Sequence, residues 1–170
     1  MAPAPTPMTT LVLIRHGESE ANLREDTHLA GRSPKSALTP KGVRQAAAVG
    51  AMLRARYGPS LSGVTAVYAS PAVRAAGTAT AALAAAGAPA DHPITLAEEL
   101  LEIDQGDWED ALREEIITPE TLVRRVTGGS WDSVGRTHVS NGGAVEVGVT
   151  ANEDLILLRC NDDAHVRGVV

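Results

Sequence analysis

The run Arg-His-Gly-Glu-Ser-Glu-Ala-Asn at residues 15–22 gathers side chains that suit the handling of a phosphate group. A neutral imidazole such as that of His16 can attack phosphorus and form a phosphohistidine, which water later hydrolyses. The guanidinium of Arg15 can bind phosphate oxygens through its planar fork, and Gly17 lets backbone N–H groups approach closely. A lone histidine after a strand is more often structural, but the whole run indicates a phosphoryl-transfer site.

A second cation, Arg74, lies in the first turn of a predicted helix that begins at Ser70-Pro71. A positive charge at that end of a helix opposes the helix dipole, unless an anion binds there. One interpretation is therefore a solvated arginine that tolerates a small penalty. We favour anion binding by Arg74 and the helix end, because ligands of α/β sheets bind where the strands end and the two preceding strands are expected to be neighbours.

The acidic stretch from Glu98 to Asp110 contains the candidate for proton transfer. The leaving group of a phosphate ester must be protonated near neutral pH, and a positioned carboxyl group can supply that proton. Glu102 is the candidate. The alternative is a solvated acidic loop, which composition alone favours.

The elements that must position these residues alternate between strand and helix. Each strand is a short apolar run, and two of the helices begin with a Ser or Thr cap followed by proline. The predicted order is a buried strand Leu11–Ile14, a helix from Thr39-Pro40 to Tyr57 that Gly58-Pro59 stops, a buried strand Val64–Ala69, a helix from Ser70-Pro71 to about Ala86, a weak strand Ile94–Leu96, a short helix capped by Thr118-Pro119-Glu120, and late strands Ala144–Val149 and Leu155–Cys160. This alternation predicts an α/β fold, a three-layer α/β/α domain with a mostly parallel sheet.

Length and composition limit the classes of protein. The 170 residues suit one domain, which we place at residues 10–170 after a disordered leader at residues 1–9. The net charge of −6 argues against a nucleic-acid partner but not against a small phosphorylated substrate. No apolar run approaches the ~20 residues of a membrane span, and the single Cys160 cannot form an internal disulfide, so we expect a cytoplasmic protein without a membrane partner. The five histidines lack metal-ligand spacing, so neither a metal nor a cofactor is expected.

Four motifs in order resemble those of the histidine phosphatase superfamily, also called phosphoglycerate mutase-like. They are Arg-His-Gly-Glu-Ser-x-x-Asn at 15–22, Leu-Thr-x-x-Gly-x-x-Gln-Ala at 38–46, Ser-Pro-x-x-Arg-Ala at 70–75 and Leu-x-Glu-x-x-x-Gly-x-Trp-Glu at 100–109. The resemblance covers about residues 11–120. It implies a phosphohistidine on His16, a phosphate pocket with Arg15 and Arg74, and Glu102 as proton donor and acceptor. By the same resemblance, Gly17, Ser19 and Asn22 would contact the substrate.

One part of the family pattern is missing. The family has a second histidine, in a His-Gly pair at the end of a later strand, and no such pair follows His16 here. In one alignment of the tail, Asn141 replaces that histidine. In the other, Asn141 opens a late hairpin, and residues 161–165 match the family's closing Asn-Asp-x-Ala-His pattern. The second alignment explains more residues and predicts that a central strand and helix are missing, with residues 131–137 in their place; His138 is a weaker candidate for a displaced second histidine.

These features predict a phosphomonoester hydrolase that acts on a small phosphorylated metabolite. The first alternative is a catalytically impaired phosphate-binding or regulatory form of the same fold, which the missing His-Gly pair favours. The second is a phosphoglycerate mutase-type phosphotransferase, which would have to retain the phosphate and donate it again. The sequence leaves the physiological substrate and the oligomeric state open.

Overall fold

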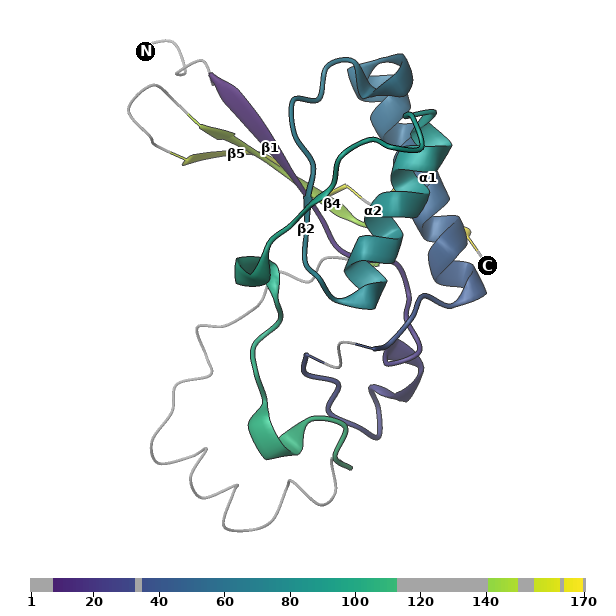
Figure 1. Cartoon of the computed structure of the whole chain (residues 1–170), viewed down its shortest axis with the longest axis vertical. Coiled ribbons are helices and arrows are strands. Elements are labelled where there is room, and N and C mark those ends of the chain that lie inside the picture. Colours follow the sequence, from purple (N-terminus) through teal and green to yellow (C-terminus); the bar gives the residue numbers. More distant parts are fainter. Residues whose placement is uncertain (1–7, 33–34, 113–140, 150–154, 163, 170) are drawn as a thin grey trace.

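The computed structural model describes residues 8–32, 35–112, 141–149, 155–162 and 164–169 (Figure 1). The predicted helix at Thr118, the replacement segment 131–137 and the candidate His138 lie outside these residues. The described helices are α1 (Pro40–Tyr57) and α2 (Val73–Ala86), and the short 3-10 turns are η1 (Asn22–Arg24), η2 (Pro59–Leu61), η3 (Glu98–Leu100) and η4 (Gly106–Trp108).

Helix α1 has the bounds that its sequence predicts. The hydroxyl of Thr39 accepts a hydrogen bond from the Gly42 N–H at 3.0 Å, and Pro40 takes the first helical position, where a missing N–H costs nothing. At the other end Gly58 has φ 89°, a conformation that a residue without Cβ adopts easily. Both ends are therefore determined by local chemistry.

Helices α1 and α2 pack side by side and form the helical layer of the described structure (Figure 1). Their backbones approach so closely that a Cβ atom at Gly50 of α1 would collide with the Ala82 carbonyl of α2. Val49, Ala82 and Val166 form one buried cluster, against which Ile14 of the first strand packs. Small residues thus let the two backbones approach and place α2 beside the loops that carry the candidate site.

Three strands form an antiparallel sheet in the order β1-β4-β5. They are β1 (Thr9–Ile14), β4 (Ala144–Val149) and β5 (Leu155–Asp162), with Ile14 opposite Ala144. All three predicted strands are confirmed, with β1 and β5 each two residues longer than expected. The β4–β5 hairpin directly follows Asn141, which supports the alignment in which this residue opens a late hairpin.

The other two strands form a separate parallel pair. β2 (Tyr68–Ala69) and β3 (Thr95–Leu96) pair with Tyr68 opposite Thr95. The expected α/β fold class is confirmed. Within the described residues, β2 and β3 pair in parallel, whereas the pairs of β4 with β1 and β5 are antiparallel. The described helices supply one helical layer.

Three local predictions need correction. The strand predicted at Val64–Ala69 is a ladder over its last two residues only, because its sole described partner, β3, is equally short. The buried character expected of the strands is wrong, since Leu11, Leu13 and Tyr68 are 46%, 54% and 63% exposed. The two leucines lie on the opposite face of β1 from Ile14, and the described helices do not cover that face.

The second helix also begins later than predicted. Ser70 does not cap it, because its hydroxyl accepts the Ala72 N–H at 3.3 Å within a turn and Ala72, with ψ 132°, is not yet helical. Arg74 nevertheless lies in the first turn of α2, as expected.

Candidate active site

His16 lies two residues after the end of β1, in a loop that is fixed against the start of β4. The Arg15 N–H donates to the Gly143 carbonyl at 3.0 Å, and the Gly142 N–H donates back to the Arg15 carbonyl at 3.2 Å. On the other side of the loop, a Cβ at Gly17 would collide with the Gly42 carbonyl of α1. The loop is therefore held between the sheet and α1, and only glycine fits at position 17.

The hydrogen bonds of the His16 ring define its tautomer. Nδ1 lies 2.7 Å from the Gly17 carbonyl, which can only accept, so Nδ1 carries the proton. Nε2 lies 3.2 Å from Nε of Arg74, which can only donate, so Nε2 carries a lone pair. The ring is thus the neutral form whose free nitrogen is directed at a cation.

The surroundings of His16 also favour the neutral ring. Burial lowers the pKa of His16 below its ordinary value of 6.5, the Gly17 carbonyl opposes this, and the charges of Arg74 and Arg15 lower the pKa further. The Glu102 carboxylate acts in the opposite direction to the two arginines. A neutral imidazole is the form that can attack phosphorus near neutral pH.

Arg74 is buried and held by backbone groups at both ends of its guanidinium. Nη1 donates to the Arg32 carbonyl at 3.0 Å, and Nη2 lies 3.4 Å from the Gly31 carbonyl. Only 6% of the residue is exposed, and burial lowers its pKa, although an arginine remains a cation at neutral pH. The structure therefore brings His16 and Arg74 together, as expected. The strands that precede them, β1 and β2, were expected to be neighbours, but in the described structure they are paired in different sheets.

Arg15 and Glu102 complete the charges around His16. The charge of Arg15 lowers the pKa of both His16 and Arg74, and the charge of Glu102 raises both. The Glu102 carboxylate accepts the Ile103 N–H at 3.1 Å, and the side chain is exposed. A carboxylate that solvent can reach, beside two arginines and an imidazole, is suited to exchange protons with a bound molecule.

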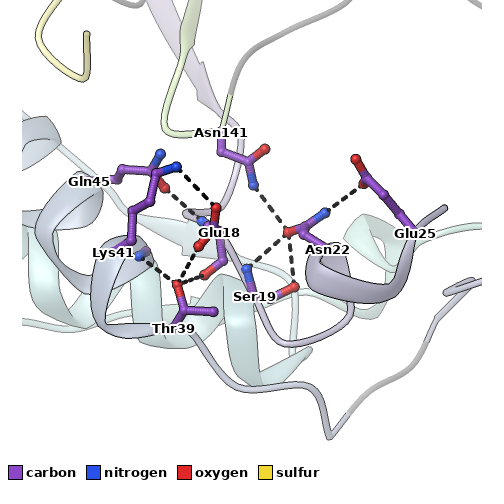
Figure 2. Close-up of polar contacts among 9 residues, drawn as sticks. Glu18, Ser19, Asn22, Glu25, Thr39, Lys41, Gln45 and Asn141 are labelled. Atoms are coloured by element: carbon purple, nitrogen blue, oxygen red, sulfur yellow. Dashed lines mark hydrogen bonds and ion pairs between the residues drawn. The ribbon is translucent and has the colours of Figure 1, made fainter. Parts of the chain in front are cut away.

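Ser19 and Asn22, both expected to contact substrate, contact each other (Figure 2). The N–H and hydroxyl of Ser19 donate to Asn22 Oδ1 at 2.9 and 3.0 Å, and Ser19 is 0% exposed. Asn141 Nδ2 donates to the same oxygen at 3.1 Å, which ties the residues before β4 to this loop. These contacts shape the loop, and direct contact of either residue with substrate stays a prediction.

Glu18 fastens the same loop to the start of α1 (Figure 2). Its N–H donates to Gln45 Oε1 at 2.8 Å, and its carboxylate accepts the Thr39 hydroxyl at 2.8 Å and pairs with Lys41 at 3.3 Å. The residue that caps α1 therefore also binds the loop that carries His16.

The motifs of the sequence contain Gln45 and Glu109, and Thr78 follows the third motif by three residues, but sequence reasoning assigned none of the three a part in the site. Thr78 accepts the buried Gly17 N–H at 3.0 Å and donates to the Arg74 carbonyl at 2.7 Å. One signal was available, since Thr78 stands four residues after Arg74 and so lies on the same face of α2. The contact of Asn141 with Asn22 spans 119 residues and has no local signal.

The described residues offer neither a metal site nor a helix that could span a membrane. Within them, no group of three or more His, Cys, Asp or Glu side chains is placed to hold a metal ion. No helix among them has both the length and the apolar character needed to cross a membrane.

The described structure is an α/β domain in which the imidazole of His16 meets the buried guanidinium of Arg74, and comparison with known proteins gives the family. The chain belongs to the histidine phosphatase superfamily (branch 1), whose family model matches residues 11–132. The resemblance found in the motifs is therefore confirmed. Among curated protein sequences, none matches this chain significantly.

Solved structures with similar folds span nearly the whole chain. Phosphoserine phosphatase from Entamoeba histolytica, in complex with 3-phosphoglyceric acid, is 22% identical with a TM-score of 0.67, and the match covers 94% of this chain and 100% of that one. YhfR from Bacillus stearothermophilus is 21% identical with a TM-score of 0.70, over 92% and 98%. The alpha-ribazole phosphatase from Shigella flexneri is 19% identical with a TM-score of 0.69, over 90% and 96%. At these identities the likeness shows the fold alone.

Proposed function

We propose that this chain hydrolyses a phosphomonoester of a small metabolite through a phosphohistidine on His16. The observation that carries the proposal is the state of the His16 ring. Its Nδ1 proton is held by the Gly17 carbonyl, and its Nε2 lone pair meets the buried guanidinium of Arg74. A phosphoryl group in contact with Nε2 and with the guanidinium would be attacked by Nε2, while the guanidinium stabilises the phosphoryl oxygens.

The proposed reaction has two steps. In the first, Nε2 of His16 attacks phosphorus, the P–O bond to the alcohol breaks, and the alcohol oxygen takes a proton from the Glu102 carboxyl group. In the second, water attacks the phosphohistidine, Glu102 takes the proton from that water, and the N–P bond breaks to release phosphate and the neutral ring. Arg15 and Arg74 bind the phosphoryl oxygens throughout, so that no metal is needed.

The neighbouring structures support the type of substrate. Two of the neighbours described above are phosphatases, and one of them was solved with 3-phosphoglyceric acid. We therefore propose a small phosphorylated metabolite, and a cytoplasmic location stays a prediction.

One specific observation favours a second function, phosphate binding with little turnover. No His-Gly pair follows His16 in the 170 residues. A second imidazole would stabilise charge on the transferring oxygens, a contact worth about 3 kcal/mol or a hundredfold in rate. A chain without this second imidazole would bind the phosphate group of a substrate but hydrolyse the ester slowly.

Hydrolysis of an aryl phosphate by the purified chain, with His16→Ala and His92→Ala beside it, tests the proposal. His92 lies in the segment between α2 and β3, outside the site, and is the matched control. We expect His16→Ala to lower kcat/KM about a thousandfold, since the covalent route is lost, and His92→Ala to match the wild type.

Equal rates for the wild type and His16→Ala would overturn the enzymatic proposal. In that case, a rise in melting temperature with inorganic phosphate, lost in Arg74→Ala, would support the binding function. Acid-labile label retained on the wild type from a radioactive phosphate ester, and absent from His16→Ala, would identify the intermediate.

A further inference from the structure

The orientation of Arg74 depends on a turn that lies far from it in the sequence. Its Nη1 and Nη2 groups contact the carbonyls of Arg32 and Gly31 at 3.0 and 3.4 Å, which leaves Nε directed at His16. Two neighbouring carbonyls thus fix both ends of one planar guanidinium. If this turn moved, Arg74 would lose the contacts that aim it.

Glu109 holds this turn in place. Its Oε1 accepts the Arg32 N–H at 2.8 Å and lies 3.4 Å from the Gln105 N–H, so one carboxylate oxygen joins the turn to the acidic loop. Gly31 has φ +46°, and a Cβ there would lie 2.9 Å from Cγ of Glu109. The carboxylate side chain therefore packs directly against the turn as well as bonding to it.

A continuous series of contacts then runs from Glu109 to the reactive nitrogen. Glu109 binds the N–H of Arg32, the carbonyl of Arg32 binds Arg74, and Arg74 contacts Nε2 of His16. The Glu109 carboxylate also raises the pKa of Arg74, against the larger effect of burial, which places its charge near the guanidinium. The acidic loop thus supplies two carboxylates that act on Arg74, the exposed Glu102 and the partly buried Glu109.

We propose that Glu109 is a positioning residue, which acts through the Gly31-Arg32 turn to aim Arg74 at His16 and at the phosphoryl group. This inference rests on the proposed function for its effect on turnover. The contacts also lead to a prediction that does not depend on turnover: the pKa of the His16 ring should change when the Glu109 side chain is shortened.

The experiment compares Glu109→Ala and Glu109→Gln, with Asp107→Ala as control. Glutamine keeps an acceptor oxygen for the two N–H groups, whereas alanine removes it. The control Asp107 is an exposed acid in η4, the turn that ends just before Glu109. We expect Glu109→Ala to lower kcat/KM about tenfold to a hundredfold, as small misplacements of a binding group do. Glu109→Gln should keep at least about half of the wild-type value, since its acceptor remains, and Asp107→Ala should match the wild type.

The second readout is the pKa of the His16 ring, followed by NMR and assigned by the loss of its signal in His16→Ala. In Glu109→Ala the pKa should rise toward its ordinary value, because the charge of Arg74 moves away, while Glu109→Gln should leave it unchanged. A merely structural role for Glu109 would lower the melting temperature of both variants without this difference.

The outcomes separate the two proposals. A wild type without turnover overturns the proposed function, while the His16 titration still decides the part of Glu109. A wild-type His16 pKa in Glu109→Ala overturns the positioning role, and so does a Glu109→Gln variant as impaired as Glu109→Ala.

If the alanine variant fails to fold, Glu109→Asp replaces it, because the shorter side chain keeps the charge but cannot reach the Arg32 N–H. Equal His16 pKa values in the aspartate and glutamine variants would then count against the proposal.

Discussion

Thr78 and Gly17 are joined by a buried hydrogen bond that links helix α2 to the loop of His16. The Gly17 N–H donates to the Thr78 hydroxyl at 3.0 Å, and that hydroxyl donates to the Arg74 carbonyl one turn earlier. The same residue thus contacts the neighbour of the proposed nucleophile and the backbone of the arginine that faces it. It joins the His16 loop to α2 in addition to the direct contact between Arg74 Nε and His16 Nε2.

Replacement of Thr78 by valine tests this connection. Valine keeps the shape but leaves the Gly17 N–H buried and unpaired, which should lower the free energy of unfolding by about 1–3 kcal/mol. Phosphate affinity should fall as well, because the loop is no longer fixed to α2. Urea unfolding measures the first effect and titration with inorganic phosphate the second. Thr78→Ser, which retains the hydroxyl, should stay near the wild type; a valine variant with unchanged stability would show that the bond contributes nothing.

Two glycines in the helices should respond oppositely to alanine. A Cβ at Gly50 would collide with the Ala82 carbonyl, so Gly50→Ala should destabilise the fold by about 1–3 kcal/mol through overpacking. A Cβ at Gly77 would lie 3.5 Å from Cδ1 of Leu38, an ordinary contact, so Gly77→Ala should stabilise α2 by up to about 1 kcal/mol. Thermal melts of the two variants check the prediction, which fails if both shift in the same direction.

The titration of His16 should make stability depend on pH. The pKa of the folded ring is lowered from 6.5, so between the two values the unfolded chain binds more protons than the folded one. The contribution of His16 to the free energy of unfolding is therefore fully present above pH 6.5 and is lost as the pH falls through the lower, folded value. Urea unfolding between pH 8 and about 5 should show a steeper loss for the wild type than for His16→Gln, since glutamine has no such proton to bind. Parallel curves would mean that the fold does not favour the neutral ring.

A buried carboxylate far from His16 in the sequence should matter for stability. Glu146 of β4 is 8% exposed, pairs with Arg56 and accepts the Tyr57 hydroxyl at 2.9 Å. Glu146→Ala leaves the arginine without this partner and should cost about 3–5 kcal/mol. Tyr57→Phe removes one hydrogen bond and should cost about 1 kcal/mol, as measured by urea unfolding. Comparable losses in the two variants would show that the ion pair adds little beyond the tyrosine contact.

The sequence predicts well those features that are determined within a few residues. Helix α1 was predicted to the residue because Thr39, Pro40 and Gly58 each act on the backbone next to them. The candidate site was centred on His16 and Arg74, since each follows a strand whose apolar pattern could be recognised.

The sequence fails where a partner from elsewhere in the chain decides. Residues 64–67 have the apolar character of a strand, but a ladder needs a neighbouring strand, and β3 provides one only opposite Tyr68 and Ala69. Glu109 contacts Arg32, which lies 77 positions away in the sequence, and Asn141 contacts Asn22, which lies 119 positions away. Such pairings have no local pattern, so only the folded chain reveals them.

The separation of β1 and β2 into different sheets has a consequence for how the site can be altered. In the described structure no ladder of backbone hydrogen bonds sets the distance between His16, the proposed nucleophile, and Arg74. That distance depends on side-chain contacts and on how closely two alanine-rich helices approach. Side-chain contacts can change by fractions of an ångström, whereas a strand register changes only in whole residues. The reactivity of this site is therefore open to gradual adjustment by substitutions in the helix interface, remote from any atom that meets the substrate.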